Sequence, residues 1–208
     1  MNEVAIINYE MGNLKSINSA CEKVGLKSLI TDNSDIINKS KSLILPGVGA
    51  FNQAIKNIKR KNLYETIYKF YNSGRPIIGI CLGMQILFER SEENFNSKGL
   101  GIIKGSVENI GENKKKNNLI NIGWREIKIN KSKDTYLDYS NNKKKFYFIH
   151  KFICKPSDQK VILCESKFNN KYFCAAIKHK NIEAYQFHPE KSGICGLNIY
   201  KNLKNKLR

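Results

Sequence analysis

The feature that most constrains the fold is a short apolar stretch at 76–80 that runs into Gly-Ile-Cys-Leu-Gly. Its β-branched residues predict a buried strand, and the apolar spacing that follows Cys81 predicts a helix. Gly79 and Gly83 stand two residues either side of Cys81. They allow strand and helix to approach closely while the central residue takes a strained backbone conformation. The sequence therefore predicts a sharp strand–turn–helix with a cysteine at the bend.

Such a bend suits a nucleophile. At a helix N-terminus, unpaired N–H groups and the helix dipole stabilise a thiolate against its usual pKa of about 8.5. The same N–H groups can stabilise an oxyanion. The alternative is a buried structural cysteine in a tight turn, so a second element is needed to decide.

Alternation of apolar strands and helices predicts the fold class. The β-like runs in the first half lie at 4–7, 26–30, 42–45 and 76–80, and all but the run at 26–30 are followed by apolar residues at helical spacing. We expect an α/β fold with a flavodoxin-like, mostly parallel sheet flanked by helices. After Glu93, short β-like runs between Asn- and Lys-rich loops, among them the run at 146–154, predict extra antiparallel strands, and a helix is expected over 193–207. Length and composition predict a single domain over 1–208.

Composition excludes several classes of function. The six cysteines form no Cys-x-x-Cys pair, so neither a zinc site nor a redox dithiol is predicted, and no metal or cofactor is expected. The net charge is +18, but the lysines are dispersed, and the runs at 114–116 and 143–145 are typical of solvated loops. We expect no nucleic-acid partner. A secretion signal and a long apolar segment are both missing, which predicts a cytoplasmic protein without a membrane partner.

The second element is Ala-Tyr-Gln-Phe-His-Pro-Glu at 184–190. An alternating strand brings His188 to its end, and Pro189 cannot continue the strand ladder. Glu190 can orient the imidazole, and His188 can serve as the base for Cys81. A histidine at a strand end is often structural, but together the two elements supply a nucleophile, a base and an orienting carboxylate.

The segment 79–85 together with His188-Pro189-Glu190 resembles the class I glutamine amidotransferases, whose Cys-His-Glu triad releases ammonia from glutamine. Within them, the chain is most similar to the glutaminase subunits of imidazole glycerol phosphate synthases. The narrower likeness rests on the segments 8–14, 45–51, 123–124 and 147–150, and it covers the chain in order.

The resemblance implies the class I amidotransferase fold and a set of site residues, with no cofactor or metal. Cys81 would attack glutamine, His188 would move protons and Glu190 would orient His188. The oxyanion would be stabilised by Gly47, Val48, Gly49 and Leu82, and bound glutamine would contact Gln85, Glu93, Lys151 and Phe152.

The resemblance also implies a partner. In the family, a separate (β/α)8-barrel cyclase forms a heterodimer with the glutaminase and uses its ammonia to make imidazole glycerol phosphate in histidine biosynthesis. By this likeness, Asn13, Trp124, Arg125 and Tyr147 would lie at the interface.

Some positions depart from the family pattern. Asn121 and Arg125 stand where the family usually has His and Asn, and Lys151-Phe152 replaces a small hydroxyl residue and a tyrosine. These changes leave open a paralogous glutaminase that supplies ammonia for amidino groups on bacterial surface sugars. An alternative from another class is a flavodoxin-like cysteine peptidase or redox protein, and a third is a pseudoenzyme retained as a binding scaffold.

Overall fold

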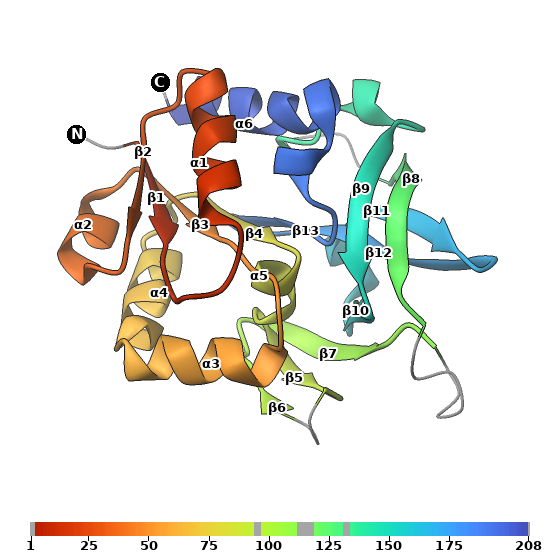
Figure 1. Cartoon of the computed structure of the whole chain (residues 1–208), viewed down its shortest axis with the longest axis horizontal. Coiled ribbons are helices and arrows are strands. Elements are labelled where there is room, and N and C mark those ends of the chain that lie inside the picture. Colours follow the sequence, from red (N-terminus) through yellow and green to blue (C-terminus); the bar gives the residue numbers. More distant parts are fainter. Residues whose placement is uncertain (1–2, 94–96, 112–118, 131–133, 208) are drawn as a thin grey trace.

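The computed structural model describes residues 3–93, 97–111, 119–130 and 134–207. Within them, a run of parallel strands forms one half of a mixed sheet (Figure 1). These strands pair in the order β2 (Ser28–Thr31), β1 (Val4–Ile7), β3 (Ser42–Leu45), β4 (Ile77–Ile80) and β13 (Ile182–Tyr185). The last strand in the sequence therefore lies beside β4, the strand that leads to Cys81.

Helices cover both faces of the parallel strands (Figure 1). One face packs against α1 (Leu14–Lys23) and α6 (Gly193–Leu207), and the other against α2 (Ser34–Lys39), α3 (Phe51–Arg60) and α4 (Leu63–Asn72). Alternate strand residues face the two layers: Val4 and Ile6 pack with the first set, Ala5 and Ile7 with the second. The α/β fold class is confirmed.

The second half of the chain extends the sheet with mainly antiparallel strands. From β13 the order continues through β12 (Lys171–His179), β10 (Phe152–Pro156), β7 (Ile103–Asn109), β5 (Phe88–Ser91) and β6 (Ser97–Lys98). A branch from β12 adds β11 (Ile162–Phe168), β8 (Asn121–Ile129) and β9 (Lys145–His150). The 3-10 turns are η2 (Tyr139–Asn141), η3 (Gln159–Val161) and η4 (Pro189–Lys191).

Two local predictions differ from the structure, and one short helix was not predicted. The helix after Cys81, α5 (Leu82–Gln85), is a single turn and gives way to β5, so the helix dipole contributes little at the cysteine. The run at 146–154 is divided into β9 and β10 at Lys151. The short helix α2 was not predicted because it is mostly polar; the Asn33 side chain caps it by accepting from the N–H groups of Asp35 and Ile36.

The bend at Cys81 is as tight as the sequence predicts. Cys81 has φ +51° and ψ −108°, a conformation that non-glycine residues rarely adopt. A Cβ on Gly83 would lie 1.9 Å from the carbonyl oxygen of Leu45, and one on Gly79 would lie 2.9 Å from Cβ of Ala184. The α5 backbone therefore rests directly on the end of β3, which fixes the height of Cys81 above the sheet.

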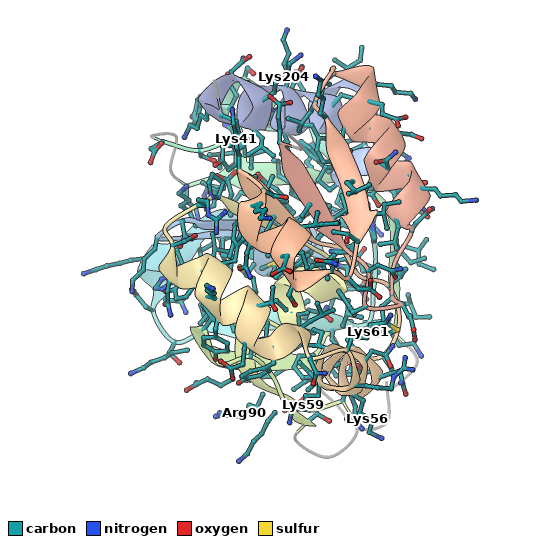
Figure 2. All side chains as sticks on the ribbon, turned by 90° about the vertical axis from the view of Figure 1, so that its left-hand side faces the viewer. Lys41, Lys56, Lys59, Lys61, Arg90 and Lys204 are labelled. Atoms are coloured by element: carbon teal, nitrogen blue, oxygen red, sulfur yellow. The ribbon has the colours of Figure 1, made fainter. Side chains whose placement is uncertain are left out.

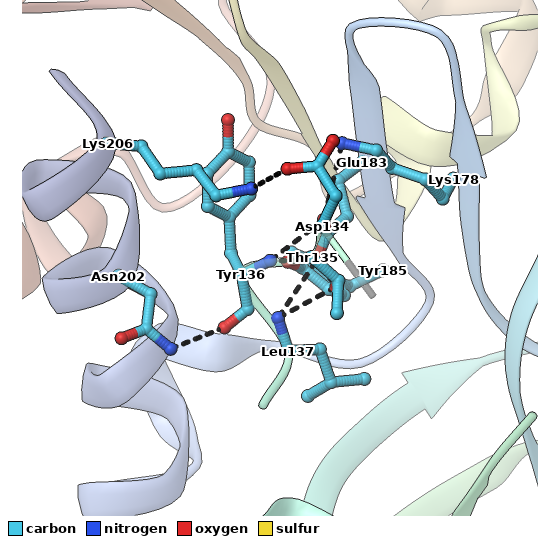
Figure 3. Close-up of polar contacts among 9 residues, drawn as sticks. All are labelled: Asp134, Thr135, Tyr136, Leu137, Lys178, Glu183, Tyr185, Asn202 and Lys206. Carbon is cyan, nitrogen blue, oxygen red and sulfur yellow. Dashed lines mark hydrogen bonds and ion pairs between the residues drawn. The ribbon is translucent and has the colours of Figure 1, made fainter. Parts of the chain in front are cut away.

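A buried carboxylate fixes β13 to its surroundings (Figure 3). Glu183 is fully buried and accepts hydrogen bonds from the backbone N–H groups of Tyr136 and Leu137 and from the hydroxyls of Thr135 and Tyr185. Several donors offset the cost of burying this charge. Asn202 on α6 adds a bond to the Tyr136 carbonyl at 2.9 Å. The segment 134–137 is thereby attached to both β13 and α6.

Basic side chains are spread over separate elements. Figure 2 shows Lys56 and Lys59 of α3 at the opposite end of the view from Lys204 on α6, while Arg90 on β5 lies on the same side as α3. The lysine run at 143–145 is exposed where the chain enters β9, and the run at 114–116 lies outside the described residues. In the described part of the chain, no helix has both the length and the apolar character needed to span a bilayer.

Replacing Gly83 with alanine tests the close packing at the bend. The added Cβ would meet backbone, which cannot rotate away, so we expect Gly83→Ala to lose at least about 3 kcal/mol of unfolding free energy in urea. Gly74→Ala is the matched control, because its φ is +74° but no atom lies within 4 Å of the added Cβ. It should lose about 1 kcal/mol. Equal losses in the two variants would contradict the packing argument.

Candidate active site

Two neighbouring parallel strands deliver the candidate nucleophile and base to one place. Ile80 of β4 is paired with Tyr185 of β13, and the Cys81 N–H donates to the Tyr185 carbonyl at 2.7 Å. Beyond β13, the N–H of His188 donates to the Tyr147 carbonyl of β9 at 2.9 Å. Both strands therefore end at the same edge, where reactive groups of parallel sheets commonly gather.

His188 and Glu190 form a buried pair at this edge. Nδ1 of His188 lies 2.7 Å from Oε1 of Glu190 across the turn at Pro189, and both side chains are almost inaccessible to solvent. Burial acts to lower the pKa of His188, but the nearby Cys81 and Glu190 raise it to about 10. The imidazole therefore holds a proton at neutral pH that it can give to a leaving group.

A second histidine nearby is unsuited to be the base. His150 is buried, and burial lowers its pKa to about 3. Its Nδ1 donates to the Phe152 carbonyl at 2.9 Å, and its Nε2 lies 2.9 Å from Nδ2 of Asn121. Since Asn121 Nδ2 can only donate, Nε2 accepts. Both ring nitrogens are thus engaged, which leaves His188 as the histidine free to exchange a proton.

The loop at 46–51 is held at both ends. The Tyr9 hydroxyl donates to the Pro46 carbonyl, and the Phe51 N–H donates to Oε2 of Glu93 at 2.8 Å. Burial and the nearby Cys81 raise the pKa of Tyr9, so its hydroxyl keeps the proton that it donates. Between the two anchors, Gly49 has φ +117° and Val48 is exposed. The middle of the loop thus faces solvent beside Cys81.

A cavity of about 140 Å³ opens at Cys81. It is lined by Val48, Gly49, Cys81, Leu82, Gln85, Glu93, Ile149, His150, Lys151 and Phe152. All four side chains predicted to contact glutamine line this cavity. Gly47 does not; it lies beneath, where a Cβ would come within 2.6 Å of Leu82 Cβ. The volume is small compared with pockets for drug-sized ligands, which favours a ligand the size of an amino acid.

Two of the cavity residues already have partners in the protein. Nε2 of Gln85 donates to the Phe152 carbonyl and to Oε1 of Gln186, each at 3.1 Å, so only its Oε1 can serve a ligand, as an acceptor. Glu93 uses Oε2 for the Phe51 N–H. Its other carboxylate oxygen can still accept from a bound ammonium group.

The predicted interface residues do not all share one face. Trp124 and Tyr147 are paired across β8 and β9, with ring centroids 6.0 Å apart, and Trp124 is half-exposed. Arg125 points to the other face of β8, where Nε donates to Oδ1 of Asn121 at 3.0 Å. Asn13 is exposed and caps α1 through the Ser16 N–H. Arg125 is therefore on the opposite side of β8 from the Trp124 ring.

Several residues at the site were not predicted. Gln186 contacts Cys81, Tyr9 holds the loop, and Asn121 fixes the tautomer of His150. Gln186 had one signal, its position two residues before His188. The other two contacts depend on pairing between distant strands, which spacing along the chain does not reveal. In the described part of the chain, no cluster of three or more His, Cys, Asp or Glu side chains could hold a metal ion.

Comparison with known proteins adds to this geometry. The model of the glutamine amidotransferase class-I family matches residues 5–202. The imidazole glycerol phosphate synthase subunit HisH of Methanocaldococcus jannaschii is 43% identical over 199 residues, covering 96% of this chain and 97% of the relative. The HisH subunit of Aquifex aeolicus is 38% identical, covering 97% and 95%. The chain belongs to the class-I glutamine amidotransferases, in the HisH family.

Solved structures agree on the fold of this amidotransferase. A structure of PurLQS from Thermotoga maritima has a TM-score of 0.77 at 18% identity, covering 100% of this chain and 99% of that one. A structure described as a glutamine amidotransferase gives 0.71 at 16% identity, covering 96% and 97%. At such low identity the likeness concerns the fold alone.

Histidine titration tests the electrostatics of the amidotransferase, which has only three histidines. In ¹⁵N-detected spectra we expect His188 to titrate near pH 10, His179 below its usual range because of burial, and His150 to stay neutral from about pH 5 upward. Cys81 is one of the groups that raise the pKa of His188, so Cys81→Ala should lower the His188 midpoint. Cys195→Ala, which alters a half-buried cysteine on α6, should leave it unchanged. An unchanged midpoint in Cys81→Ala would contradict the proximity of thiol and imidazole.

Proposed function

We propose that this chain is the glutaminase subunit of an imidazole glycerol phosphate synthase, which hydrolyses glutamine to glutamate and passes the ammonia to a (β/α)8-barrel cyclase for histidine biosynthesis. One observation carries the proposal: Cys81 opens into a cavity lined by Gln85 and Glu93, and it lies beside the buried pair of His188 and Glu190. This arrangement offers a thiol nucleophile, a proton donor and groups that can hold an amino acid.

In the proposed reaction, the Cys81 sulfur attacks the carboxamide carbon of glutamine and forms a tetrahedral intermediate. Backbone N–H groups of Leu82, Val48 and Gly49, which line the cavity, stabilise the negative oxygen. The His188 imidazolium protonates the nitrogen, the C–N bond breaks and ammonia leaves a thioester on Cys81. Water, deprotonated by His188, then attacks the thioester carbon and releases glutamate and the thiol.

Glutamine's own charges fit the same cavity. Glu93 is placed to accept from the α-ammonium group, and Gln85 can accept through Oε1. Lys151, exposed at the β9–β10 junction, can pair with the α-carboxylate. A free amino acid carries both of these charges on its α-carbon and a residue within a chain carries neither, so these contacts favour free glutamine over a peptide bond within a chain.

An exposed apolar face supports the proposed partner. On β8 and β9, Ile122 is paired with Ile149 and Trp124 with Tyr147. Ile122, Trp124 and Ile149 are exposed. Ile149 also lines the cavity, so this face adjoins the site where ammonia would be released. Apolar groups of this size at a protein surface are typical of an interaction site. The relatives are named as subunits of imidazole glycerol phosphate synthase, which agrees with a partner chain here.

Glutamate release from glutamine tests the proposed reaction. With the barrel cyclase of the same organism and its nucleotide substrate present, we expect Cys81→Ala to lower the rate at least about a thousandfold, because the nucleophile is gone. Cys195→Ala is the control and should keep the wild-type rate. Wild-type protein that releases no glutamate, or a Cys81→Ala variant that remains active, would contradict the proposal.

Binding of the cyclase tests the proposed interface. Trp124→Ala should weaken the affinity about 30-fold or more, because central aromatic residues dominate such interfaces. Tyr172→Ala removes a similarly exposed aromatic from β12, outside the proposed face, and should bind as the wild type does. Titration calorimetry measures both. Equal affinity for Trp124→Ala and wild type would place the interface elsewhere.

A further inference from the structure

Gln186 touches the sulfur of Cys81. Its side chain is fully buried, and Nε2 lies 3.6 Å from Sγ in donor geometry. The amide oxygen is occupied by Gln85, whose Nε2 donates to it at 3.1 Å. Gln186 does not line the cavity. It therefore approaches the sulfur from inside the protein.

The sheet explains how Gln186 reaches this position. β4 and β13 end side by side at Ile80 and Tyr185. Cys81 is the residue that follows β4, and Gln186 is the residue that follows β13. The Gln186 N–H is bonded to the Ala175 carbonyl of β12 at 2.8 Å, which fixes its backbone. Gln85 lies one helical turn after Cys81, with its N–H on the Cys81 carbonyl, and so faces the same amide.

The orientation of the Gln186 amide is fixed by a continuous set of hydrogen bonds. Gln85 gives its second N–H to the Phe152 carbonyl, which also accepts Nδ1 of His150. His150 in turn accepts from Asn121, whose oxygen accepts Nε of Arg125. Neutral His150 has one ring proton, which Nδ1 donates, so Nε2 can only accept. Only one orientation of the Asn121, Gln85 and Gln186 amides agrees with all of these hydrogen bonds. In it, Gln186 presents N–H, not oxygen, to the sulfur.

We propose that Gln186 is a further catalytic residue, whose side-chain N–H stabilises the Cys81 thiolate on the side facing away from the substrate cavity. The assignment rests on the proposed glutaminase function and adds a second group acting on the sulfur besides His188. A hydrogen bond to an anionic acceptor is stronger than one to a neutral acceptor. Gln186 thus favours the ionised, reactive form of the thiol and holds it below the cavity.

Replacing Gln186 with methionine tests the proposal, because the side chain keeps its length and loses the donor. We expect kcat for glutamine to fall about ten- to a hundredfold while KM stays within about twofold, since Gln186 touches the sulfur and not the substrate. The His188 midpoint should also fall, because less thiolate remains to hold its proton. Gln159→Met is the matched control: Gln159 is exposed and donates to the Pro156 carbonyl, and its loss should change neither readout.

If Gln186→Met fails to fold, NMR spectra of the glutamine side-chain amides in the Cys81→Ala variant test the same contact. The chain has only four glutamines, so their side-chain amide resonances can be assigned. In Cys81→Ala the Gln186 amide proton should shift, and that of Gln159 should not. An unchanged Gln186 resonance overturns the proposal, as does a folded Gln186→Met with wild-type kcat and His188 midpoint. Absence of glutamate release in the wild type would instead refute the glutaminase function and leave the amide shift intact.

Discussion

Hydrogen bonding between β4 and β13 joins two parts of the chain that are far apart in the sequence. The pairing of Ile80 with Tyr185 sets Cys81 beside the segment that carries Gln186, His188 and Glu190. A shift of this register by one residue would turn every β13 side chain to the other face of the sheet. The relative placement of thiol, imidazole and amide thus follows from backbone pairing, and local turns only refine it.

Two buried carboxylates, one on β13 and one just after it, are held by hydrogen bonds within the protein. Glu183 accepts hydrogen bonds from the segment 134–137, and Glu190 is hydrogen-bonded to His188. A buried charge without partners would cost several kcal/mol, so each carboxylate favours the arrangement that supplies its donors. The polar network around Gln85 and His150 acts in the same way on the other side of Cys81. The core near the site is therefore specified by polar as well as apolar contacts.

The sequence predicted local structure better than relations between strands. The structure agrees with the predicted bend at Cys81 and with the helix over 193–207, which depend on local spacing. It also places Gln85, Glu93, Lys151 and Phe152 around one cavity, as the family resemblance implies. The sequence did not reveal that α5 has only one turn, because the apolar residues Ile86, Leu87 and Phe88 follow it directly and extend the apolar pattern into β5. The direction of Arg125 depends on the pleat of β8, and the role of Tyr9 on its contact with a loop 37 residues away. Neither is encoded by neighbouring residues.

β13 comes after all of the other described strands in the sequence, yet it lies in the middle of the sheet, between β4 and β12. Until it is inserted, β4 has an unpaired edge and the Cys81 turn lacks the backbone acceptor of Tyr185. A nascent chain therefore cannot assemble the thiol with its imidazole before β13 and the residues that follow it, as far as His188, have been synthesised. Non-local closure of this kind slows folding. It also delays activation of the sulfur until the surrounding protein is in place to shield it.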